Sequence, residues 1–392
     1  MNIIIYTNIL TPYRKYFYDL MYEECRKAGD NFYILVMSET ESDRNWNYED
    51  LKGDYTILLN SLTFNKGSAH IHYNNDLKSK LELLKPDVVI CAGSYLCPGT
   101  WTIARLKNKL NYKCIYWSES HLNEKRNYGK IILKFRDLLR KKFYESYDGF
   151  WYAGEKSKEF IKKYALSKAT YFFMPNLVEN KKYLKSIKIR EESSEKIKKE
   201  MKINLNKFIF ICPARLTAVK GICEFLEIVS ESKFKDKFII LLAGDGELKE
   251  KIKDKSVEYE IDIRILGFID QNKMIELYSI ADALLLPSLS DPNPLTCIES
   301  LWAGLSLFIS SHCGNYPEVV KNGKNGYVFD YKNKREVLRL FEKLINKPQE
   351  WKEEAQKNSL EIAETIYNSE LVVNRILKEI NSFFNENKKI NI

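Results

Sequence analysis

The sequence predicts an α/β protein with two doubly wound parallel sheets. Short apolar segments alternate with amphipathic segments of helical length along almost the whole chain. That alternation is typical of parallel strands joined by crossover helices. At 392 residues the chain is long enough for two domains that each bury a core. Hydrophobic residues make up 45% of the sequence, which is a globular composition.

Each half of the chain contributes its own strands and helices. Short apolar runs that end at turn residues suit strands buried on both faces. In the first half we expect strands at 3–6, 32–36, 55–59, 88–91, 114–117, 149–152 and 171–174, and helices at 13–27, 75–84 and 98–110. In the second half we expect strands at 208–212, 238–243, 262–266, 283–286, 307–310 and 327–329, and helices at 222–232, 271–280 and 335–346.

Composition predicts the boundary between the halves. Residues 179–207 are highly charged and weakly apolar, so we interpret them as a linker in which a local helix can form. This linker separates an N-terminal domain, 1–178, from a C-terminal domain, 208–360. Residues 361–392 follow as a helical segment with a frayed end.

Positive charge is concentrated in one part of the chain. Residues 105–163 contain 16 Lys and Arg against 7 Asp and Glu, an excess equal to the formal net charge of +9 for the whole chain. A localised basic segment indicates an anionic partner, which can be nucleic acid, a lipid surface or a polyphosphate substrate. Nucleic acid is the weakest of these alternatives because the sequence contains no recognisable basic-aromatic module.

The centre of the basic segment predicts an amphipathic helix over residues 125–147. Its apolar positions share one face, whereas Lys130, Lys134, Lys141 and Lys142 largely lie elsewhere. Such a helix can pack on a core with a solvated basic side, or it can dock on an anionic membrane, which the surplus charge favours. The apolar positions are Ile131, Ile132, Phe135, Leu138, Leu139 and Phe143.

Targeting signals and cysteine usage indicate the compartment. The first ten residues predict a strand rather than a signal peptide, because they lack a basic n-region and Thr7 and Asn8 interrupt the apolar run. No segment of the sequence is long and apolar enough to span a bilayer. The eight cysteines form no CxxC pair. We therefore expect a reduced, cytoplasmic protein that can attach peripherally to the inner face of the membrane.

Residues 282–330 carry the most specific signal in the chain. They predict a buried strand, a loop rich in turn residues, a helix that ends at Gly304, and a further strand. Asp291 falls in the loop and Glu299, eight positions later, falls inside the helix. Both carboxylates are therefore expected near the carboxyl end of a parallel strand, where open α/β sheets bind ligands.

This stretch resembles the donor-site signature of family 4 retaining glycosyltransferases, which have the GT-B fold. In that signature a first Glu contacts the hydroxyls of the donor sugar and a second Glu binds the nucleotide ribose. Here Asp291 takes the first place and Glu299 the second, and the match continues through 302–304 and 314–319. The resemblance implies two Rossmann-like domains that face each other across a cleft.

The resemblance also gives each part of the chain a role. The N-terminal domain, 1–178, is expected to bind the acceptor, and the C-terminal domain, 208–360, the nucleotide sugar. The segment 361–392 is expected to cross back onto the N-terminal domain.

A second motif, 213–221, follows an apolar strand and resembles the diphosphate-binding run of the family. Arg215 and Lys220 would bracket the diphosphate, since a planar fork of donors and a point charge together stabilise a leaving group that gains negative charge. The next strand ends in a turn with Gly244 and Gly246, which the resemblance places close to the nucleotide. A dinucleotide-binding fingerprint is the rival interpretation, but it lacks its third glycine.

Two further loops complete the expected donor site. By resemblance, the turn at Gly267 and Phe268 meets the nucleobase. Pro294 replaces a family glycine whose N–H helps to hold the donor, and proline has no N–H. The remaining backbone donors in that loop are those of Asn293, Leu295 and Thr296.

The first half offers fewer matches to the family. Residues 11–14 open a helix after the first strand but lack the family's glycines, so Tyr13 and Arg14 are expected to shape the acceptor side. His121 lies after another strand, where many relatives carry a His, and it can hydrogen-bond a sugar hydroxyl or take the proton of the acceptor. Glu119 is the competing candidate for that role.

Together these motifs predict transfer of a sugar, with retention, from a nucleotide-diphosphate sugar to a glycan or lipid-linked acceptor. The expected setting is bacterial surface polysaccharide or glycolipid assembly. We expect no cofactor and no metal, because the sequence has no Asp-x-Asp pair and Arg215 and Lys220 supply positive charge. Two alternatives stay open: a non-catalytic GT-B subunit that binds a nucleotide sugar or stabilises a partner enzyme, and a GT-B sugar epimerase.

Overall fold

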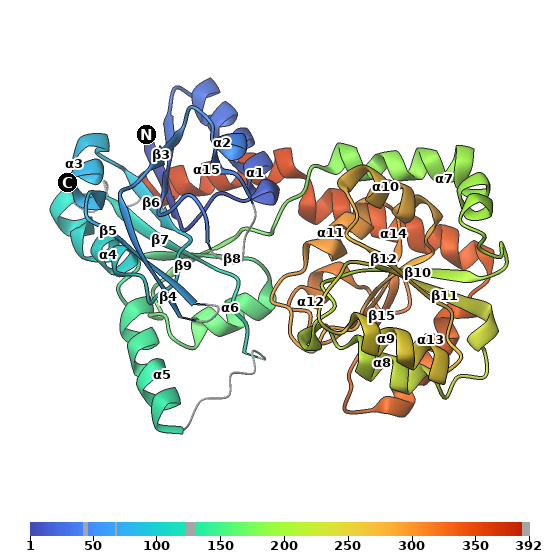
Figure 1. The fold of residues 1–392 in the computed structure, drawn as a ribbon. Helices are drawn as coiled ribbons and strands as arrows, with labels where there is room; N and C mark the ends of the chain where they lie inside the picture. Colours follow the sequence, from blue (N-terminus) through green and yellow to red (C-terminus); the bar gives the residue numbers. More distant parts are fainter. Residues whose placement is uncertain (42–45, 67–68, 123–129, 386–392) are drawn as a thin grey trace. The chain divides into compact units, whose positions relative to one another are not determined.

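The computed structural model describes residues 1–41, 46–66, 69–122 and 130–385. These residues form two compact units (Figure 1). The first unit comprises the described residues of 1–122, 130–178 and 369–385, and the second comprises 179–368. Each unit is built around one parallel sheet, so the two predicted doubly wound sheets are confirmed.

The first unit contains a seven-stranded parallel sheet in the order β3-β2-β1-β6-β7-β8-β9. The order reverses between β1 and β6, which are the neighbours at its centre. Its strands are β1 (Asn2–Thr7), β2 (Asn31–Val36), β3 (Thr56–Leu58), β6 (Val88–Cys91), β7 (Lys113–Ser118), β8 (Gly149–Tyr152) and β9 (Thr170–Phe173). Its helices are α1 (Pro12–Lys27), α2 (Tyr48–Leu51), α3 (Leu77–Leu84), α4 (Pro98–Leu110), α5 (Lys130–Tyr144), α6 (Glu155–Lys162) and α15 (Ser369–Asn385).

Strand β1 shows why this sheet is covered on both faces. Its apolar residues are fully buried, and alternate side chains point to opposite sides of a strand. Ile3 and Ile5 pack in one core with side chains of α1 and α15, whereas Ile4 and Tyr6 pack in a second core with side chains of α3 and α4. An apolar run without polar alternation therefore produces a strand between two layers of helices.

A hairpin, β4 (Ser61–Lys66) and β5 (Ala69–Asn74), is an addition to this unit that the sequence did not predict. Its strands are antiparallel and pair Leu62 with Tyr73 and Thr63 with His72. The face that carries Leu62, Phe64 and Tyr73 is exposed, whereas His72 is buried.

The second unit contains a six-stranded parallel sheet in the order β12-β11-β10-β13-β14-β15. Its strands are β10 (Phe208–Pro213), β11 (Phe238–Ala243), β12 (Ile263–Gly267), β13 (Ala283–Leu286), β14 (Ser306–Ser310) and β15 (Gly326–Phe329). Its helices are α7 (Asn180–Glu200), α8 (Ile222–Val229), α9 (Lys249–Glu258), α10 (Gln271–Ile280), α11 (Leu295–Trp302), α12 (Tyr316–Val319), α13 (Lys334–Ile345) and α14 (Gln349–Tyr367). The strand order reverses at β10 and β13, and ligands bind outside the carboxyl ends of the strands at such a switch point.

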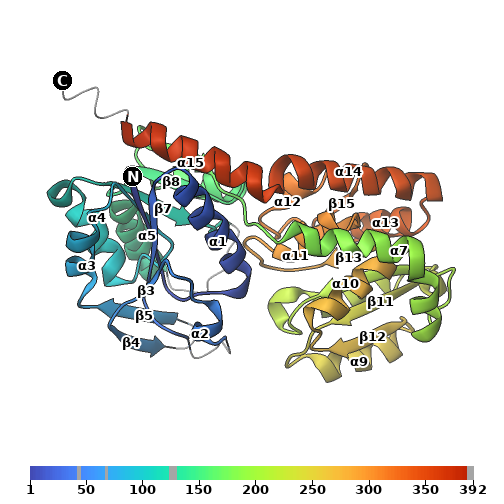
Figure 2. The ribbon, with the colours of Figure 1, turned by 90° about the horizontal axis from the view of Figure 1, so that it is seen from above.

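Helix α7 occupies most of the segment that we interpreted as a linker. It packs along α10 and α11 of the second unit (Figure 2). The half-buried Arg190 side chain helps to hold it there, because its guanidinium donates to the carbonyls of Tyr278, Ser279 and Ala303. One arginine that satisfies three backbone acceptors thus joins the buried Tyr183 and Ser186 in attaching this charged helix to its unit.

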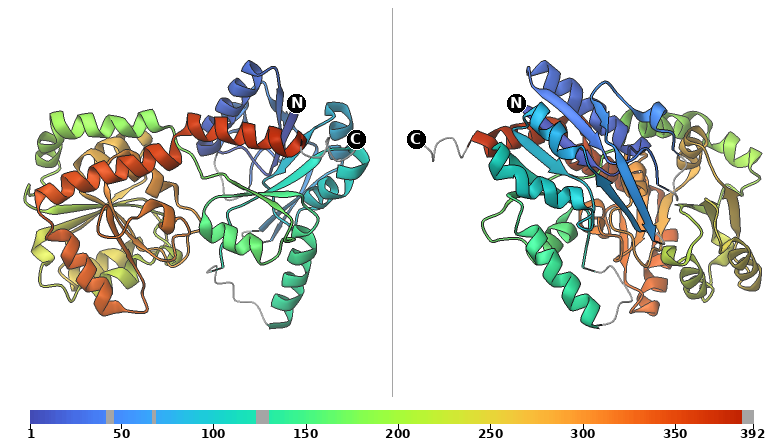
Figure 3. Two further views of the ribbon diagram at one scale, coloured as in Figure 1. Left: turned by 180° about the vertical axis from the view of Figure 1, so that it is seen from behind. Right: turned by 60° about the vertical axis from the view of Figure 1, so that its left-hand side comes forward.

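The chain leaves the second unit at Asn368, between two long helices. Helix α14 belongs to the second unit and α15 to the first. Helix α15 buries Val372, Val373, Ile376 and Ile380, and it packs against α1 (Figure 3). Of the predicted frayed tail, residues 386–392 lie outside the described part of the chain. No helix within the described ranges combines the length and hydropathy needed to cross a bilayer.

We expect Arg190→Met to lower the free energy of unfolding by about 2–4 kcal/mol, because three buried carbonyls lose a charged donor. Urea denaturation followed by circular dichroism measures this change. Lys188→Met on the same helix is the matched control, since the Lys188 side chain is 76% exposed and should leave the unfolding midpoint unchanged. Equal midpoints for the two variants would contradict the anchoring role.

Candidate functional site

The candidate site lies in the second unit, where the loops after β10 and β13 meet. The chain after β10 makes a short 3₁₀ turn, Ala218–Lys220, and reaches Gly221 at a φ of +64°. A Cβ atom on Gly221 would lie 2.2 Å from the carbonyl oxygen of Pro287. Only glycine therefore allows the two loops to approach this closely. The Tyr331 hydroxyl ties them together by donating to the carbonyls of Gly221 and Pro287.

This contact brings Lys220 against Asp291. The Lys220 Nζ lies 2.6 Å from the Asp291 Oδ2, and the two side chains are only 19% and 13% exposed. The backbone of Asp291 is held as well, because its N–H donates to His312 and its carbonyl accepts from Gly314. Two residues that the sequence analysis assigned to different parts of the donor are thus an ion pair. An ammonium group has three N–H donors, so the pairing with Asp291 leaves Lys220 with donors for a ligand.

Arg215 lies on the same loop as Lys220, two residues after the end of β10 at Pro213. Its side chain is exposed. The neighbouring Leu216 is fully buried, and its N–H and carbonyl bond with Asp245 and Leu248 of the loop after β11. The backbone on which Arg215 is mounted is therefore fixed, while its guanidinium faces solvent.

Steric constraints explain why positions 244 and 246 are glycines. A Cβ on Gly244 would lie 2.0 Å from the carbonyl oxygen of Ala214, and one on Gly246 would lie 2.6 Å from that of Leu216. Because neither residue has a Cβ, the loop after β10 can pack directly against both glycines. They thereby set the position of Arg215.

Glu299 is held by two tyrosines that the sequence analysis did not single out. Its Oε1 accepts from the Tyr183 hydroxyl at 3.0 Å and its Oε2 from the Tyr278 hydroxyl at 2.7 Å. Burial raises the pKa of the Glu299 carboxyl above its ordinary value, and the two phenols oppose that shift. Tyr278 lies on a predicted helix, but Tyr183 lies in the predicted linker, so no sequence signal placed them together.

The remaining residues predicted for the donor site follow the carboxyl ends of β12 and β13 in the same sheet. Gly267 ends β12 with a φ of +72°, and the Phe268 side chain that follows is 90% exposed. Leu295 and Thr296 are the first two residues of α11, where backbone N–H groups have no partner within the helix. The Asn315 side chain donates to the Pro294 carbonyl and holds Asn293 and the helix start in place.

The candidates of the first unit form a separate cluster after β1 and β7. The Arg14 Nη2 lies 2.8 Å from the Glu119 Oε1, and the guanidinium stacks over the Trp117 ring at 4.3 Å. The His121 side chain is buried, whereas the Glu119 side chain is 30% exposed. The two competing candidates therefore differ in exposure, since the Glu119 side chain reaches the surface and the His121 side chain is buried.

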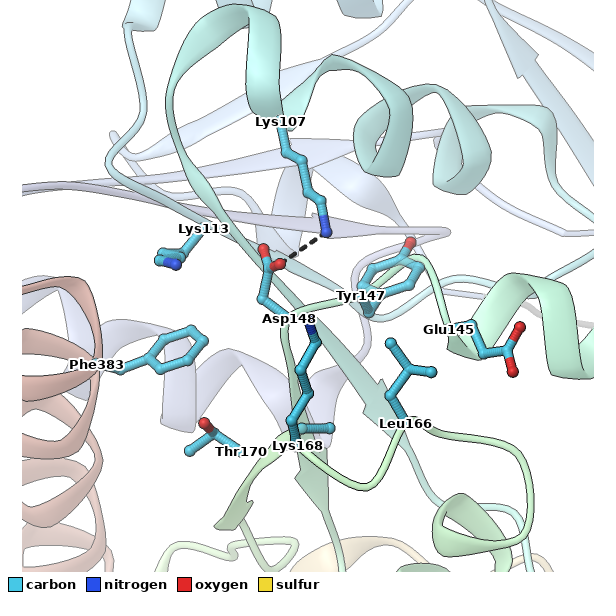
Figure 4. Close-up of a pocket in the computed structure, with 10 residues that line it drawn as sticks. Lys107, Lys113, Glu145, Tyr147, Asp148, Leu166, Lys168, Thr170 and Phe383 are labelled. Carbon is cyan, nitrogen blue, oxygen red and sulfur yellow. Dashed lines mark hydrogen bonds and ion pairs between the residues drawn. The ribbon is translucent and has the colours of Figure 1, made fainter. Parts of the chain in front are cut away.

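A cavity of about 430 Å³ lies at the opposite, amino edge of the first sheet (Figure 4). Lys107, Lys113 and Lys168 surround Asp148, which is bonded to Lys107 at 2.7 Å. Phe383 of α15 lines its other side. None of the residues predicted for donor or acceptor chemistry lines this cavity. Within the described ranges, no three His, Cys, Asp or Glu side chains are grouped closely enough to hold a metal ion.

Comparisons with known proteins bear on the second unit and on the fold. Residues 193–360 match the family model for glycosyl transferases group 1. The chain is 30% identical over 176 residues to the alpha-monoglucosyldiacylglycerol synthase of Acholeplasma laidlawii, covering 43% of this chain and 42% of that protein. It is 27% identical over 161 residues to the UDP-Gal:alpha-D-GlcNAc-diphosphoundecaprenol alpha-1,3-galactosyltransferase of Escherichia coli, covering 40% of each. The chain thus spans less than half the length of either relative.

The fold comparison extends over nearly the whole chain. The structure of Anabaena HepE in complex with UDP superposes with a TM-score of 0.73 at 13% identity, covering 97% of this chain and all of that one. At that identity the likeness establishes the fold alone. The fold class predicted from the sequence, GT-B, is confirmed, and the predicted family is confirmed for the domain at 193–360.

Proposed function

We propose that this chain, whose residues 193–360 form a glycosyl transferases group 1 domain, transfers a sugar from a nucleotide-diphosphate donor to a glycan or lipid-linked acceptor. The observation that carries the proposal is the ion pair of Lys220 and Asp291 at the switch point of the second sheet, with Glu299 on α11, the helix that follows the same strand, β13. A basic group and two carboxylates at that place match the three parts of a nucleotide sugar: diphosphate, sugar and ribose.

Each residue then has a chemical role. Lys220 and the exposed Arg215 stabilise the negative charge that the leaving diphosphate gains in the transition state. Asp291 accepts from sugar hydroxyls, and its pairing with Lys220 joins sugar recognition to phosphate recognition. Glu299 accepts from the ribose hydroxyls. Retention of configuration follows from the resemblance to family 4 enzymes.

The names of similar proteins favour a uridine nucleotide and a lipid-linked acceptor. HepE is described in complex with UDP, and the two relatives are named as a diacylglycerol glycolipid synthase and as a galactosyltransferase acting on a diphosphoundecaprenol acceptor. We therefore place the reaction in bacterial cell-surface polysaccharide or glycolipid assembly, at the cytoplasmic face of the membrane.

Lys220→Ala should lower kcat/KM by about a hundredfold or more, since removing one charge-stabilising donor costs about 2–4 kcal/mol of transition-state stabilisation. Turnover is measured with the donor that a panel of nucleotide-diphosphate sugars identifies, with and without acceptor. Lys334→Ala is the matched control, because Lys334 also pairs with a carboxylate, Glu227 at 2.9 Å, but on the exposed start of α13. Unchanged turnover in Lys220→Ala would refute the assignment.

Activity should survive EDTA. The sequence has no Asp-x-Asp pair, and Arg215 and Lys220 supply the positive charge that the leaving group requires. Turnover is measured before and after treatment with chelator and then with added Mn²⁺ or Mg²⁺. Complete loss with EDTA and recovery with either cation would contradict this chemistry.

Helix α5 is the proposed membrane-facing element of the first unit. Ile132, Phe135 and Leu138 recur at intervals of three residues and are 52%, 66% and 67% exposed. Packing on the core therefore does not account for them, although it does account for the buried Phe143. Residues 125–129 of the predicted helix, and the side chains of Lys130 and Ile131, lie outside the described part of the chain.

Basic residues flank this apolar stripe. The side chains of Lys134, Lys141 and Lys142 are exposed. Arg140 instead stacks over the Tyr95 ring at 5.2 Å, on the side of the helix that faces the unit. An exposed stripe of apolar side chains bordered by lysines is the pattern of a helix that lies in an anionic membrane surface.

Reversal of Lys134, Lys141 and Lys142 to Glu should release the protein from anionic liposomes, since each basic residue near the surface contributes about 1 kcal/mol. Flotation with anionic and neutral vesicles at low and high salt measures binding. Reversal of Lys188, Lys196 and Lys199, exposed on α7, is a control with the same change of charge. Equal binding to both lipids, or equal loss in both variants, would contradict docking through α5.

A further inference from the structure

We infer that Tyr183 and Tyr278 are positioning residues that orient the Glu299 carboxylate toward the two hydroxyls of the donor ribose. This inference rests on the proposed function, in which Glu299 binds the ribose. Its consequence is that the two phenols set the discrimination between ribose and 2′-deoxyribose nucleotides.

Three helices meet at this carboxylate. Tyr183 comes from α7, Tyr278 from α10 and Glu299 from α11. Each carboxylate oxygen accepts one phenol, at 3.0 Å from Tyr183 and 2.7 Å from Tyr278. Both tyrosines are buried, and their rings meet edge to face with centroids 6.0 Å apart. The geometry leaves the carboxylate little freedom to turn about its terminal torsion, which is otherwise broad in glutamate.

The direction of the hydrogen bonds is settled by chemistry. A carboxylate has no hydrogen, so each phenol must donate, and two oxygens offer about four acceptor positions. Two of these positions are taken by the tyrosines, which leaves one on each oxygen. Two adjacent acceptors match the two neighbouring hydroxyls of a ribose, whereas a 2′-deoxyribose can use only one of them.

The tyrosines are themselves held in place. The Gln271 side chain donates to the Tyr183 oxygen at 3.5 Å, which directs the phenol hydrogen toward Glu299. Arg190, two turns further along α7, bonds to the carbonyls of Tyr278 and Ala303 and so joins the helices that carry all three residues. The arrangement is therefore built into the packing of the unit and does not depend on a mobile side chain.

The phenols also favour the ionised form of the carboxyl. Burial raises the pKa of Glu299, and the hydrogen bonds from Tyr278 and Tyr183 lower it. Cys297, on the same helix, also interacts with Glu299, and burial raises the pKa of its thiol. Loss of a phenol should raise the pKa of Glu299 further. On acidification, each variant should therefore lose nucleotide binding at a higher pH than the native protein does.

Tyr183→Phe and Tyr278→Phe keep the rings and remove only the hydroxyls. Calorimetric titration with UDP and with 2′-deoxyuridine diphosphate, from pH 5 to pH 8, compares these variants with the native protein. We expect the affinity for UDP to fall about tenfold in each variant, with a much smaller change for the deoxynucleotide. Carbon NMR of the Glu299 carboxyl should report a higher pKa in both variants. Tyr259→Phe is the control, since the Tyr259 hydroxyl bonds to Lys255 on α9, away from this cluster.

The possible outcomes distinguish the positioning role of the tyrosines from the ribose assignment of Glu299. Equal losses of affinity for UDP and deoxy-UDP, with an unchanged pKa of Glu299, would overturn the positioning role. A native protein that binds neither nucleotide, while both variants raise the pKa of Glu299, would instead refute the ribose assignment of the proposed function. Glu299→Gln leaves both tyrosines in place and tests the ribose assignment alone. It should bind UDP no better than deoxy-UDP, and an unchanged preference for UDP would refute that assignment.

Discussion

The contact between Gly221 and the Pro287 carbonyl is the constraint on which the candidate donor site depends. It joins the loops that follow β10 and β13, the two strands at which the order of the second sheet reverses. With a side chain at position 221 the loops would have to separate, and Lys220 would move away from Asp291. The site therefore depends on the sheet topology and on the absence of a Cβ atom at position 221. Together these position the loops that carry Lys220 and Asp291.

The two carboxylates of the site are stabilised in different ways. Asp291 pairs with an ammonium group, so its charge is neutralised inside the protein. Glu299 receives two neutral phenols and keeps its net charge. A neutral hydrogen-bond donor fixes the direction of the carboxylate without cancelling its charge, which suits the ribose-binding role proposed for Glu299. A charged partner suits Asp291, because a bare carboxylate beside a diphosphate would repel it.

Much of this fold was predictable because the strands are buried on both faces. Such strands appear in the sequence as short apolar runs, and the six expected in the second half correspond to β10 through β15. The hairpin β4–β5 was missed because its strands alternate apolar and polar residues and expose one face. Lys220 and Asp291 were predictable as single residues, but their pairing was not, since 71 positions separate them in the sequence.

The tyrosines could not be found in the sequence for a related reason. Tyr183 lies in a charged segment whose composition is that of a linker, and its burial comes from contacts that α7 makes with α10 and α11. The charged composition of such a helix reflects its many solvent-facing residues. The few buried residues, and the contacts of Arg190, determine which face packs against the unit. A helix with the composition of a linker can thus contribute a buried tyrosine to a site, because Arg190, bound to three carbonyls, helps to hold it against its unit. Assigning a function to a charged segment therefore requires locating the few residues that it buries.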